Sequence, residues 1–216
     1  MKTKKRNDRR KTSKRHSWEQ RYARSARMEQ LEHRHLLSGT NLFAQFTGLL
    51  DPARENDVEQ LAVTIAPEEL GVAQDRVVLG FRLHAQEGGT LDPDAVDIYY
   101  ENGRRVSTLY SEADIAGTTD SYVVAQLTGG DYRIDVSGGV TDRSQFRLDV
   151  FLVGDADGNH MVDRADLYAI QQMQGAQAGD GVYLAAADAD MDGRITQFDV
   201  LMARRNEAYS RGGQQP

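Results

Sequence analysis

Four aspartates lie within a stretch of twelve residues near the C-terminus, DADMDGRITQFD, residues 188–199. Asp188, Asp190 and Asp192 occupy alternate positions, and Asp199 closes the stretch. Carboxylates this close together repel one another unless a cation lies among them. Calcium is a hard cation that prefers oxygen ligands, and these ligand positions supply no sulfur or imidazole that would favour zinc. The stretch therefore predicts a calcium-binding loop.

The order of the donors is that of an EF-hand loop, which places oxygen ligands at positions 1, 3, 5, 7, 9 and 12. Gly193 stands at position six, where the chain bends sharply and a positive φ costs glycine nothing. The Arg194 carbonyl is the expected ligand at position seven, and Thr196 occupies position nine, which often holds a water. An acidic surface turn is the alternative, but the agreement at every ligand position disfavours it.

A second copy of the pattern, DADGNHMVDRAD at residues 155–166, begins 33 residues before the first. An unusual pattern that recurs within one chain is far more specific than either copy alone. His160 replaces the glycine at position six, and Asn159 supplies a neutral oxygen where the other loop has a carboxylate. We therefore expect this site to bind calcium more weakly, with His160 as a turn residue. The expected donors are Asp155, Asp157, Asn159, the Met161 carbonyl, Asp163 and Asp166.

Each loop runs directly into a predicted helix. Asp163 and Thr196 are suitable N-cap residues, and Asp166 and Asp199 follow three positions later, as in a capping box. Residues 146–154, before the first loop, read as a strand. The amphipathic helix that precedes an ordinary EF-hand loop is therefore not expected here.

The two units are predicted to face each other, with Val162 and Ile195 at position eight pairing as a short β-bridge. Loop then helix, twice, with aspartate at position twelve, resembles a type I dockerin domain over residues 154–209. The resemblance implies two bound calcium ions, held by the donors named above, and a cohesin domain as partner. Dockerins often gather polysaccharide-degrading enzymes, glycoside hydrolases among them, on a scaffold or cell surface.

In that family, positions ten and eleven of each loop help to choose the partner, often as a small hydroxyl pair. This chain carries Arg164 and Ala165 there in the first loop, and Gln197 and Phe198 in the second. The departure concerns the partner and not the metal. Docking to a cohesin-like protein and capping of the neighbouring domain both stay open.

Charge is divided unevenly along the chain. Residues 1–37 hold thirteen Lys or Arg against four Asp or Glu, a charge of +9, so the remainder must carry −16 to give the net −7. There are no cysteines, which excludes disulfides and thiolate metal sites. With 216 residues the chain has room for one or two small domains. We expect a basic, largely disordered leader (1–42), a β-sandwich (43–153), the calcium-binding region (154–209) and a flexible tail (210–216).

The basic leader is open to two interpretations. An arm that binds nucleic acid or an anionic membrane surface would have this composition. MEQLEHRHLLSG, residues 28–39, also resembles the leader of many exported proteins of planctomycete bacteria. The matching positions are Leu31, Glu32, Arg34, Leu36, Leu37 and Ser38. Because the dockerin resemblance also points outside the cytoplasm, we expect an exported, extracellular or cell-surface protein without a transmembrane segment.

The middle of the chain has the alternation of antiparallel strands: Tyr132, Ile134 and Val136 alternate with charged residues. Asn102-Gly103 is a strong hairpin signal between two of the expected strands. About seven strands with short turns predict a β-sandwich. These strands cover residues 60–66, 76–84, 95–100, 105–110, 121–127, 131–138 and 145–153. The end of this region resembles the pre-peptidase C-terminal modules of secreted bacterial enzymes.

The middle region lacks a Gly-x-Ser-x-Gly elbow, a phosphate-binding glycine loop and a His-Glu-x-x-His motif. Its single histidine, His84, is expected to be structural. Asp92, Asp94 and Asp97 resemble paired glycosidase carboxylates only loosely, since they flank Pro93 in a predicted turn.

The chain is therefore interpreted as mostly β with a small α C-terminal part. We expect a non-catalytic, exported calcium-binding interaction module. Two alternatives stay open. One is an accessory or catalytic component of polysaccharide degradation, and the other is binding of nucleic acid or an anionic surface through the leader.

Overall fold

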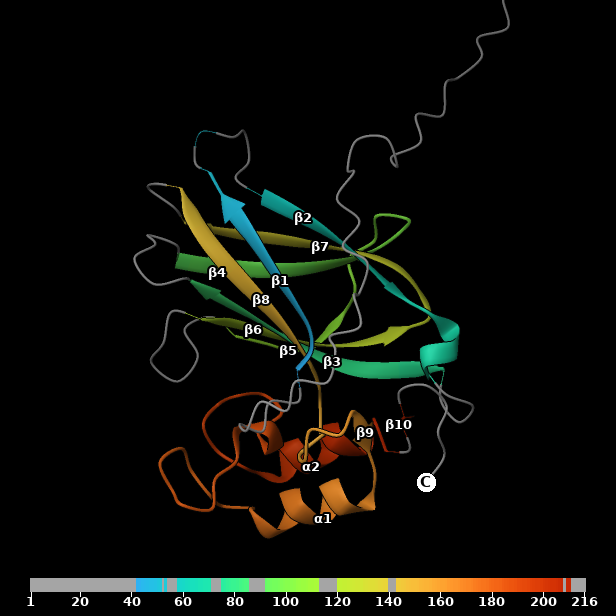
Figure 1. Cartoon of the computed structure of the whole chain (residues 1–216), viewed down its shortest axis with the longest axis vertical. Helices are drawn as coiled ribbons and strands as arrows, with labels where there is room; N and C mark the ends of the chain where they lie inside the picture. Colours follow the sequence, from blue (N-terminus) through green and yellow to red (C-terminus); the bar gives the residue numbers. More distant parts are fainter. Residues whose placement is uncertain are drawn as a thin grey trace, which may run out of the picture.

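The chain folds into two packed β-sheets followed by a small lobe that carries two helices (Figure 1). The computed structural model describes residues 42–51, 53, 58–70, 75–85, 92–112, 120–139, 143–207 and 209–210. The expected leader with its export motif and the expected tail, apart from Leu42 and Ser210, lie outside these described residues. The expected class, mostly β with a small α part, is confirmed.

Neighbouring strands in both sheets run antiparallel. The larger sheet consists, in spatial order, of β1 (Leu42–Leu50), β8 (Ser144–Leu152), β3 (Arg76–Ala85), β6 (Ser121–Thr128) and β5 (Thr108–Glu112). The smaller sheet consists of β2 (Val58–Ile65), β7 (Gly130–Gly139) and β4 (Asp92–Tyr100). A short 3-10 turn, η2 (Pro67–Leu70), follows β2.

Alternation along the strands sends every second side chain into the core between the sheets. On β3 the odd-numbered residues from Val77 to Leu83 are buried there, and Ile134 of β7 and Phe146 of β8 are buried in the same core. Burying one such side chain stabilises the fold by roughly 1.5–3 kcal/mol. The core, more than any single hydrogen bond, therefore holds the two sheets face to face.

The outer face of the larger sheet is apolar in one part and polar in another. Val78 of β3, Tyr122 and Val124 of β6, Phe151 of β8 and Val153 just after β8 are buried together beneath the helical lobe. We call these five residues the seat. An isolated sandwich would expose the seat as a contiguous apolar patch, which soluble proteins normally keep small. The sheet is therefore built to be covered at this place.

The sequence did not predict β1, which pairs with β8 at the edge of the larger sheet. Its alternation is interrupted by Gly48, a residue that usually weakens a strand. Here the glycine is required, because the ring of Phe146 lies where a side chain would begin: a Cβ at position 48 would be 2.3 Å from the Phe146 Cζ atom. The contact is long-range, so the local pattern gives no sign of it.

The Asn102-Gly103 signal is correct as a turn and wrong as a strand pair. The Gly103 amide donates to the Tyr100 carbonyl at 2.8 Å, with Gly103 at φ 80°. After a single bridge between Tyr99 and Arg105, the chain crosses to the other sheet, where β5 pairs with β6. Turn chemistry is local, whereas the partner of a strand is set by which core it helps to cover.

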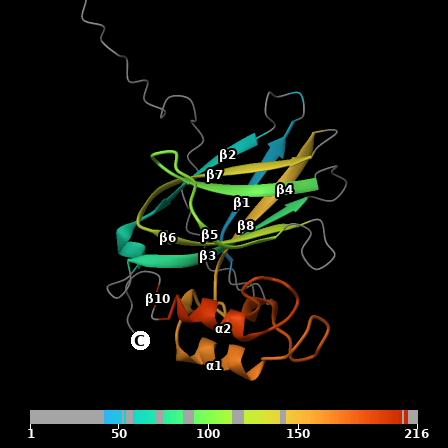
Figure 2. The same cartoon turned by 180° about the vertical axis from the view of Figure 1, so that it is seen from behind.

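The C-terminal lobe, residues 153–207, follows β8 without a linker (Figures 1 and 2). Both views show α2 on the side of the sandwich and α1 on the far side. Leu167, Ile170, Val200 and Ala203 are buried together between the helices. The elements are β9 (Met161–Val162), α1 (Arg164–Gln172), the 3-10 turn η4 (Ala185–Ala187) and α2 (Gln197–Arg204), with β10 (Tyr209–Ser210) returning to pair with β9.

The expected bridge between Val162 and Ile195 is wrong. Val162 pairs with Tyr209 of β10, and Ile195 exchanges backbone hydrogen bonds with Gly175 and Ala176. The chain between the two units folds back onto the second loop and takes the place that the first loop was expected to fill.

Candidate metal centres and their contact with the sandwich

The first acidic loop gathers its carboxylates at one point. Oxygens of Asp155, Asp157 and Asp166 all lie within 4.8 Å of one another, and Asp155 and Asp166 are buried. The Asp166 carboxylate accepts the amide of Ala156 at 2.9 Å and that of Asp163 at 2.8 Å. The last residue of the loop therefore ties its start to the beginning of α1.

The second loop also gathers three carboxylates, at positions one, three and five instead of one, three and twelve. Oxygens of Asp188, Asp190 and Asp192 lie within 4.8 Å of one another. Asp199 is buried and accepts the amides of Ala189 and Thr196, each at 2.6 Å. Asp199 thus closes its loop as Asp166 closes the first.

The predicted donors at position nine act as helix caps. Asp163 Oδ1 accepts the Ala165 amide at 2.6 Å, and Thr196 Oγ1 accepts the Phe198 amide at 3.1 Å. Both expected capping boxes are present. Among the expected carboxylate donors, Asp163 and Asp199 lie outside the two clusters of mutually close oxygens.

At position five, the side chains brace the loop backbone. Asn159 Oδ1 accepts the Met161 amide and Asp192 Oδ1 accepts the Arg194 amide, both at 2.7 Å. These bonds fix the residues whose carbonyls are expected at position seven. The two loops therefore share their backbone turns although one has an amide and the other a carboxylate at this position.

The electrostatics of both loops favour a cation. Burial, followed by the charges of neighbouring carboxylates, raises the pKa of Asp155 to about 7 and that of Asp190 to about 7. Burial likewise raises the pKa of Asp166 and of Asp188. The buried Asp188 Oδ1 has no hydrogen-bond partner. An all-oxygen donor set with an unpartnered buried carboxylate oxygen fits calcium.

Each loop carries one residue with a side chain in a left-handed backbone conformation. His160 at position six has φ 63°, as its place in the pattern predicts. Met191 has φ 56° at position four, where the first loop has Gly158. Such a conformation costs an L-residue roughly 1–2 kcal/mol. Both loops therefore contain one strained residue, so the strain at His160 does not distinguish the first loop from the second. The neutral Asn159 is the remaining reason to expect weaker calcium binding at the first site.

Tyr183 is a site residue that sequence reasoning missed. Its hydroxyl donates to Asp188 Oδ2 at 2.7 Å, next to the Gly193 amide that donates to the same oxygen at 2.9 Å. Burial, followed by the hydrogen bond to Asp188, raises the pKa of Tyr183. The internal repeat gave no signal, because the position 33 residues earlier is Val150, inside β8.

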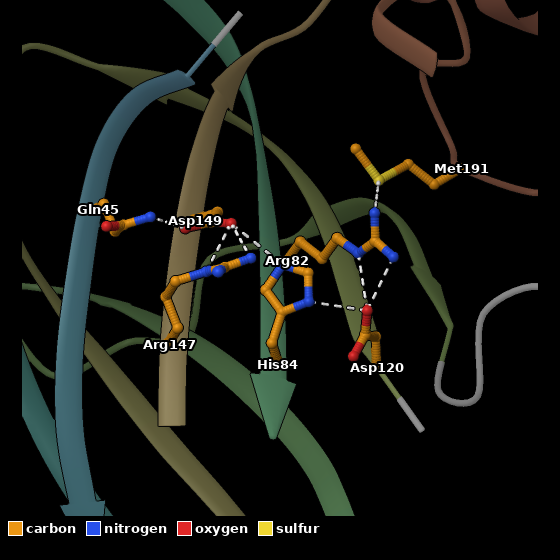
Figure 3. A network of polar contacts seen from close by, with 7 residues as sticks. All are labelled: Gln45, Arg82, His84, Asp120, Arg147, Asp149 and Met191. Carbon is orange, nitrogen blue, oxygen red and sulfur yellow. Dashed lines mark hydrogen bonds and ion pairs between the residues drawn. The ribbon is translucent and has the colours of Figure 1, made fainter. Parts of the chain in front are cut away.

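The second loop also touches the sandwich. The Tyr122 hydroxyl of the seat donates to the Ala189 carbonyl at 3.2 Å, and Arg82 Nη1 lies 3.7 Å from Met191 Sδ (Figure 3). Ala189, Met191 and Met202 are packed against the seat. The C-terminal lobe and the sandwich are thus joined directly at the second acidic loop.

The residues expected to choose a partner divide into two groups. Arg164, Ala165 and Gln197 are exposed. Phe198 is half-buried, and its ring centroid lies 6.1 Å from that of Tyr110 on β5. One of the four candidate partner residues therefore already contacts the sandwich.

The polar part of the sheet's outer face is a closed ion-pair network (Figure 3). His84 Nδ1 lies 2.8 Å from Asp120 Oδ2, and His84 Nε2 lies 3.1 Å from Asp149 Oδ2. Arg82 pairs with Asp120 at 2.8 Å, and Arg147 pairs with Asp149 at 3.0 Å. Each carboxylate is therefore matched by an arginine as well as by the imidazole, which supports the structural role expected of His84.

Of the three loosely glycosidase-like carboxylates, the structure describes the side chain of Asp97. Asp97 makes an ion pair with Arg105 across the turn. The side chains of Asp92 and Asp94 lie outside the part of the chain that the structure describes.

The lobe with the two acidic loops matches a known protein family. Residues 153–206 match the dockerin type I domain. The match spans both loops and both helices, so the resemblance that the loop pattern implied is confirmed. Dockerin type I domains bind calcium, and the match supports a calcium-dependent protein–protein docking module. Proteins with dockerin domains are typically extracellular or at the cell surface.

Two further comparisons concern the whole chain. None of the curated proteins matches it. The crystal structure of the pre-peptidase C-terminal domain of collagenase from Bacillus anthracis is similar at 12% identity and a TM-score of 0.36, covering 54% of this chain and 99% of that one. Within the described residues, no helix is long and apolar enough to cross a membrane.

Proposed function

We propose that this chain is an exported, non-catalytic module whose C-terminal lobe binds two calcium ions and docks to a cohesin-type protein. The observation that carries the proposal is the duplicated acidic cluster inside the segment that matches the dockerin type I domain. In both clusters buried carboxylates face one another, and in the second a buried oxygen lacks any partner. This is a costly arrangement without a cation.

The proposed ligands follow the loop positions in both repeats. Bound calcium neutralises the clustered carboxylates and replaces their repulsion with attraction. The first site is proposed to be the weaker one because Asn159 is neutral where Asp192 is charged. The ligands of the first site are Asp155, Asp157, Asn159, the Met161 carbonyl, Asp163 and Asp166. Those of the second are Asp188, Asp190, Asp192, the Arg194 carbonyl, Thr196 and Asp199.

Two aspartates couple the binding of calcium to the folding of the helices that form the docking surface. Asp166 and Asp199 hold the start of each loop and cap the following helix at the same time. Fixing the carboxylates therefore fixes the N-termini of α1 and α2. Since an unfolded chain cannot present these ligands together, the free energy of calcium binding adds to the free energy of unfolding.

Calorimetric titration of chelator-stripped protein with calcium, with circular dichroism recorded alongside, tests this proposal. We expect two ions and a gain of helical signal. Asp155→Asn and Asp188→Asn should each weaken one site. Asp75→Asn is the matched control, because this carboxylate is 91% exposed and lies far from either loop in sequence. An absence of binding at millimolar calcium would overturn the proposal.

The partner and the wider role are proposed by association with the dockerin family. Arg164, Ala165 and Gln197 are exposed at the starts of α1 and α2, where a partner can reach them. A cohesin domain immobilised on a biosensor should retain the protein in calcium and release it in chelator. Retention by cohesins of polysaccharide-degrading assemblies would assign the chain an accessory role there. If no cohesin of a broad panel retains the protein although calcium still binds, the partner assignment alone is overturned.

A further inference from the structure

The two repeats differ in a consistent way on one face. At three pairs of positions separated by 33 residues, a small residue of the first repeat is replaced by a large apolar one in the second, and at a fourth pair a methionine is replaced by an asparagine that hydrogen-bonds. The pairs are Gly158 and Met191, Ala165 and Phe198, Ala169 and Met202, and Met173 and Asn206. In a duplicated module, such a one-sided difference indicates that one copy has a neighbour that the other lacks.

The structure identifies that neighbour as the sandwich. Met191, Phe198 and Met202 pack in the same cluster as the seat. Ala165, the counterpart of Phe198, is exposed instead, and Ala169, the counterpart of Met202, packs within the lobe itself. The second repeat alone has therefore acquired apolar side chains for this contact.

Asn206 anchors the same contact with hydrogen bonds. Its side chain is buried and accepts the Val78 amide at 2.7 Å. It also donates to the carbonyls of Val78 at 2.8 Å and Val153 at 2.7 Å. The pairing of β3 with β8 begins at Leu79, and just beyond it the Val78 amide is bonded to Asn206 of the lobe. A buried amide left without its partner would cost about 1–3 kcal/mol.

The sandwich is adapted from its own side. Gly80 leaves room for the Tyr122 ring, since a Cβ at position 80 would lie 2.0 Å from the Tyr122 hydroxyl oxygen. That hydroxyl is aimed at the Ala189 carbonyl, to which it donates at 3.2 Å. Two residues of the sheet thus combine to reach one carbonyl of the lobe.

This contact uses the backbone of the second calcium loop itself. Ala189 is position two of the loop: its carbonyl accepts from Tyr122 and its amide donates to Asp199 Oδ1 at 2.6 Å. Met191 is position four and lies in the same interface. In the first loop, the counterpart of Ala189 is Ala156, which is buried within the lobe. The first loop joins the sheet through the chain that leads out of β8, where the Asp155 amide donates to the Leu152 carbonyl at 3.3 Å. The second loop instead meets the sheet through Ala189 and Met191, which are distant from it in sequence.

We propose that the second repeat is a calcium-dependent clasp whose partner is this chain's own sandwich, which leaves the first repeat to face an external protein. The clasp rests on the proposed function in one respect, the binding of calcium in the second loop. Order in that loop places Ala189, Met191 and Phe198 against the sheet. Loss of order there releases the lobe and uncovers the seat.

Amide hydrogen exchange of Val78 in the full-length protein tests the clasp, because this amide donates to Asn206 of the lobe at 2.7 Å. Amides in the middle of the β3–β6 pairing serve as an internal reference. We expect chelation to speed exchange at Val78 at least tenfold, with little change in the reference amides. Asp190→Asn should produce the same effect in calcium that saturates the first site. Asp157→Asn, the same position of the first loop, should leave Val78 protected.

The outcomes separate the two proposals. An equal effect of Asp157→Asn and Asp190→Asn would overturn the clasp, because coupling would then belong to the lobe as a whole. Calorimetry showing bound calcium, together with unchanged Val78 exchange on chelation, would also overturn the clasp while leaving the docking module standing. Absence of calcium binding would instead overturn the proposed function.

An affinity measurement gives an independent readout on a cohesin that the protein binds. Tyr168 on α1 is 64% exposed, whereas Phe198 contacts Tyr110. Tyr168→Ala should weaken partner binding and leave Val78 exchange unchanged, and Phe198→Ala should do the reverse. Partner binding that depends on Phe198 and not on Tyr168 would place the external face on the second repeat and contradict the clasp.

Discussion

Backbone strain at His160 is a residue-scale property of the first acidic loop. The residue has φ 63°, a conformation that costs an L-residue roughly 1–2 kcal/mol and that glycine adopts freely. If calcium orders the loop, that cost is taken from the binding free energy. We predict that His160→Gly tightens calcium binding at the first site several-fold, measured by calorimetric titration.

A matched change in the second loop provides the control. Met191→Gly relieves a similar strain at φ 56° but also removes a side chain that packs against the seat. The gain there should be smaller than at His160, or absent. A larger gain at position 191 would show that the seat contact contributes nothing to calcium affinity.

Tyr183 gives a second prediction at the residue scale. Its hydroxyl is one of two donors to Asp188 Oδ2, and a hydrogen bond to a charged group contributes about 1.5–3 kcal/mol. Tyr183→Phe removes only this bond, so the Asp188 carboxylate should be held less firmly for calcium. We expect weaker calcium binding at the second site by about tenfold. Tyr168→Phe, on an exposed ring, should leave the titration curve unchanged.

The sequence predicted the site residues whose type and spacing recur in both loops. The aspartates at alternate positions and the two capping boxes follow from spacing along a single loop and helix. Tyr183 and the left-handed Met191 did not follow, because one lies outside the repeated segment and the other shares no residue type with its counterpart Gly158. Both owe their roles to contacts made by the folded chain.

At the scale of elements, the His84 network joins β3, β8 and the residue before β6, Asp120, across the polar part of the sheet. Burial lowers the pKa of His84, but hydrogen bonds to Asp120 and Asp149 outweigh it, so the pKa is raised above 6.5. A raised folded-state pKa means that the folded protein binds more protons than the unfolded chain near neutral pH. The stabilisation is thus complete below about pH 6.5 and is lost as the pH rises through the folded-state pKa.

We predict that the melting temperature in saturating calcium falls between pH 6 and pH 8, and that His84→Gln flattens this slope. Asp120 and Asp149 act in the opposite direction at acid pH. Burial raises the pKa of each carboxyl, but the hydrogen bonds to His84 and neighbouring groups lower it overall. Their stabilisation is therefore lost as the pH falls through the lowered values. An unchanged slope in His84→Gln would show that another group is responsible.

The elements also show where local reasoning ends. The alternating strands from β2 to β8 could be predicted because half-buried strands carry their own period. Strand β1 and the crossing from β4 to β5 could not, since the first depends on the Phe146 ring over Gly48 and the second on which core the strand covers. Both are decided by residues far away in the sequence.

At the scale of the whole molecule, sequence reasoning described a sandwich and a calcium lobe, and the structure adds how they meet. Asn206 lies 128 residues from Val78, and no local pattern marks such a bond. Two signals were nevertheless present in the sequence. No linker separates the strand from the first loop, and three small residues of the first repeat are large and apolar in the second. In a duplicated module, the residues that differ between the two copies thus indicate which copy packs against a neighbouring domain.

Those differences predict unequal effects of truncation on the stability of the whole chain. Phe198 contacts the sandwich, whereas Leu201 on the same helix is 48% exposed. Phe198→Ala should lower the free energy of unfolding in calcium by roughly 1–3 kcal/mol, less than the ~3–5 kcal/mol of a fully buried Phe because the ring is half-exposed. Leu201→Ala should stay within about 0.5 kcal/mol. Urea unfolding followed by circular dichroism measures both.

Repeating the same unfolding experiment in chelator separates the clasp from ordinary packing. If calcium in the second loop holds the lobe on the sheet, the lobe is already released without it, and Phe198→Ala should then cost the sandwich almost nothing. The unfolding curve should also divide, with the lobe lost before the sandwich, whereas calcium merges the two steps into one. A Phe198→Ala effect of equal size in calcium and in chelator would mean that the lobe stays seated whatever the state of its loops.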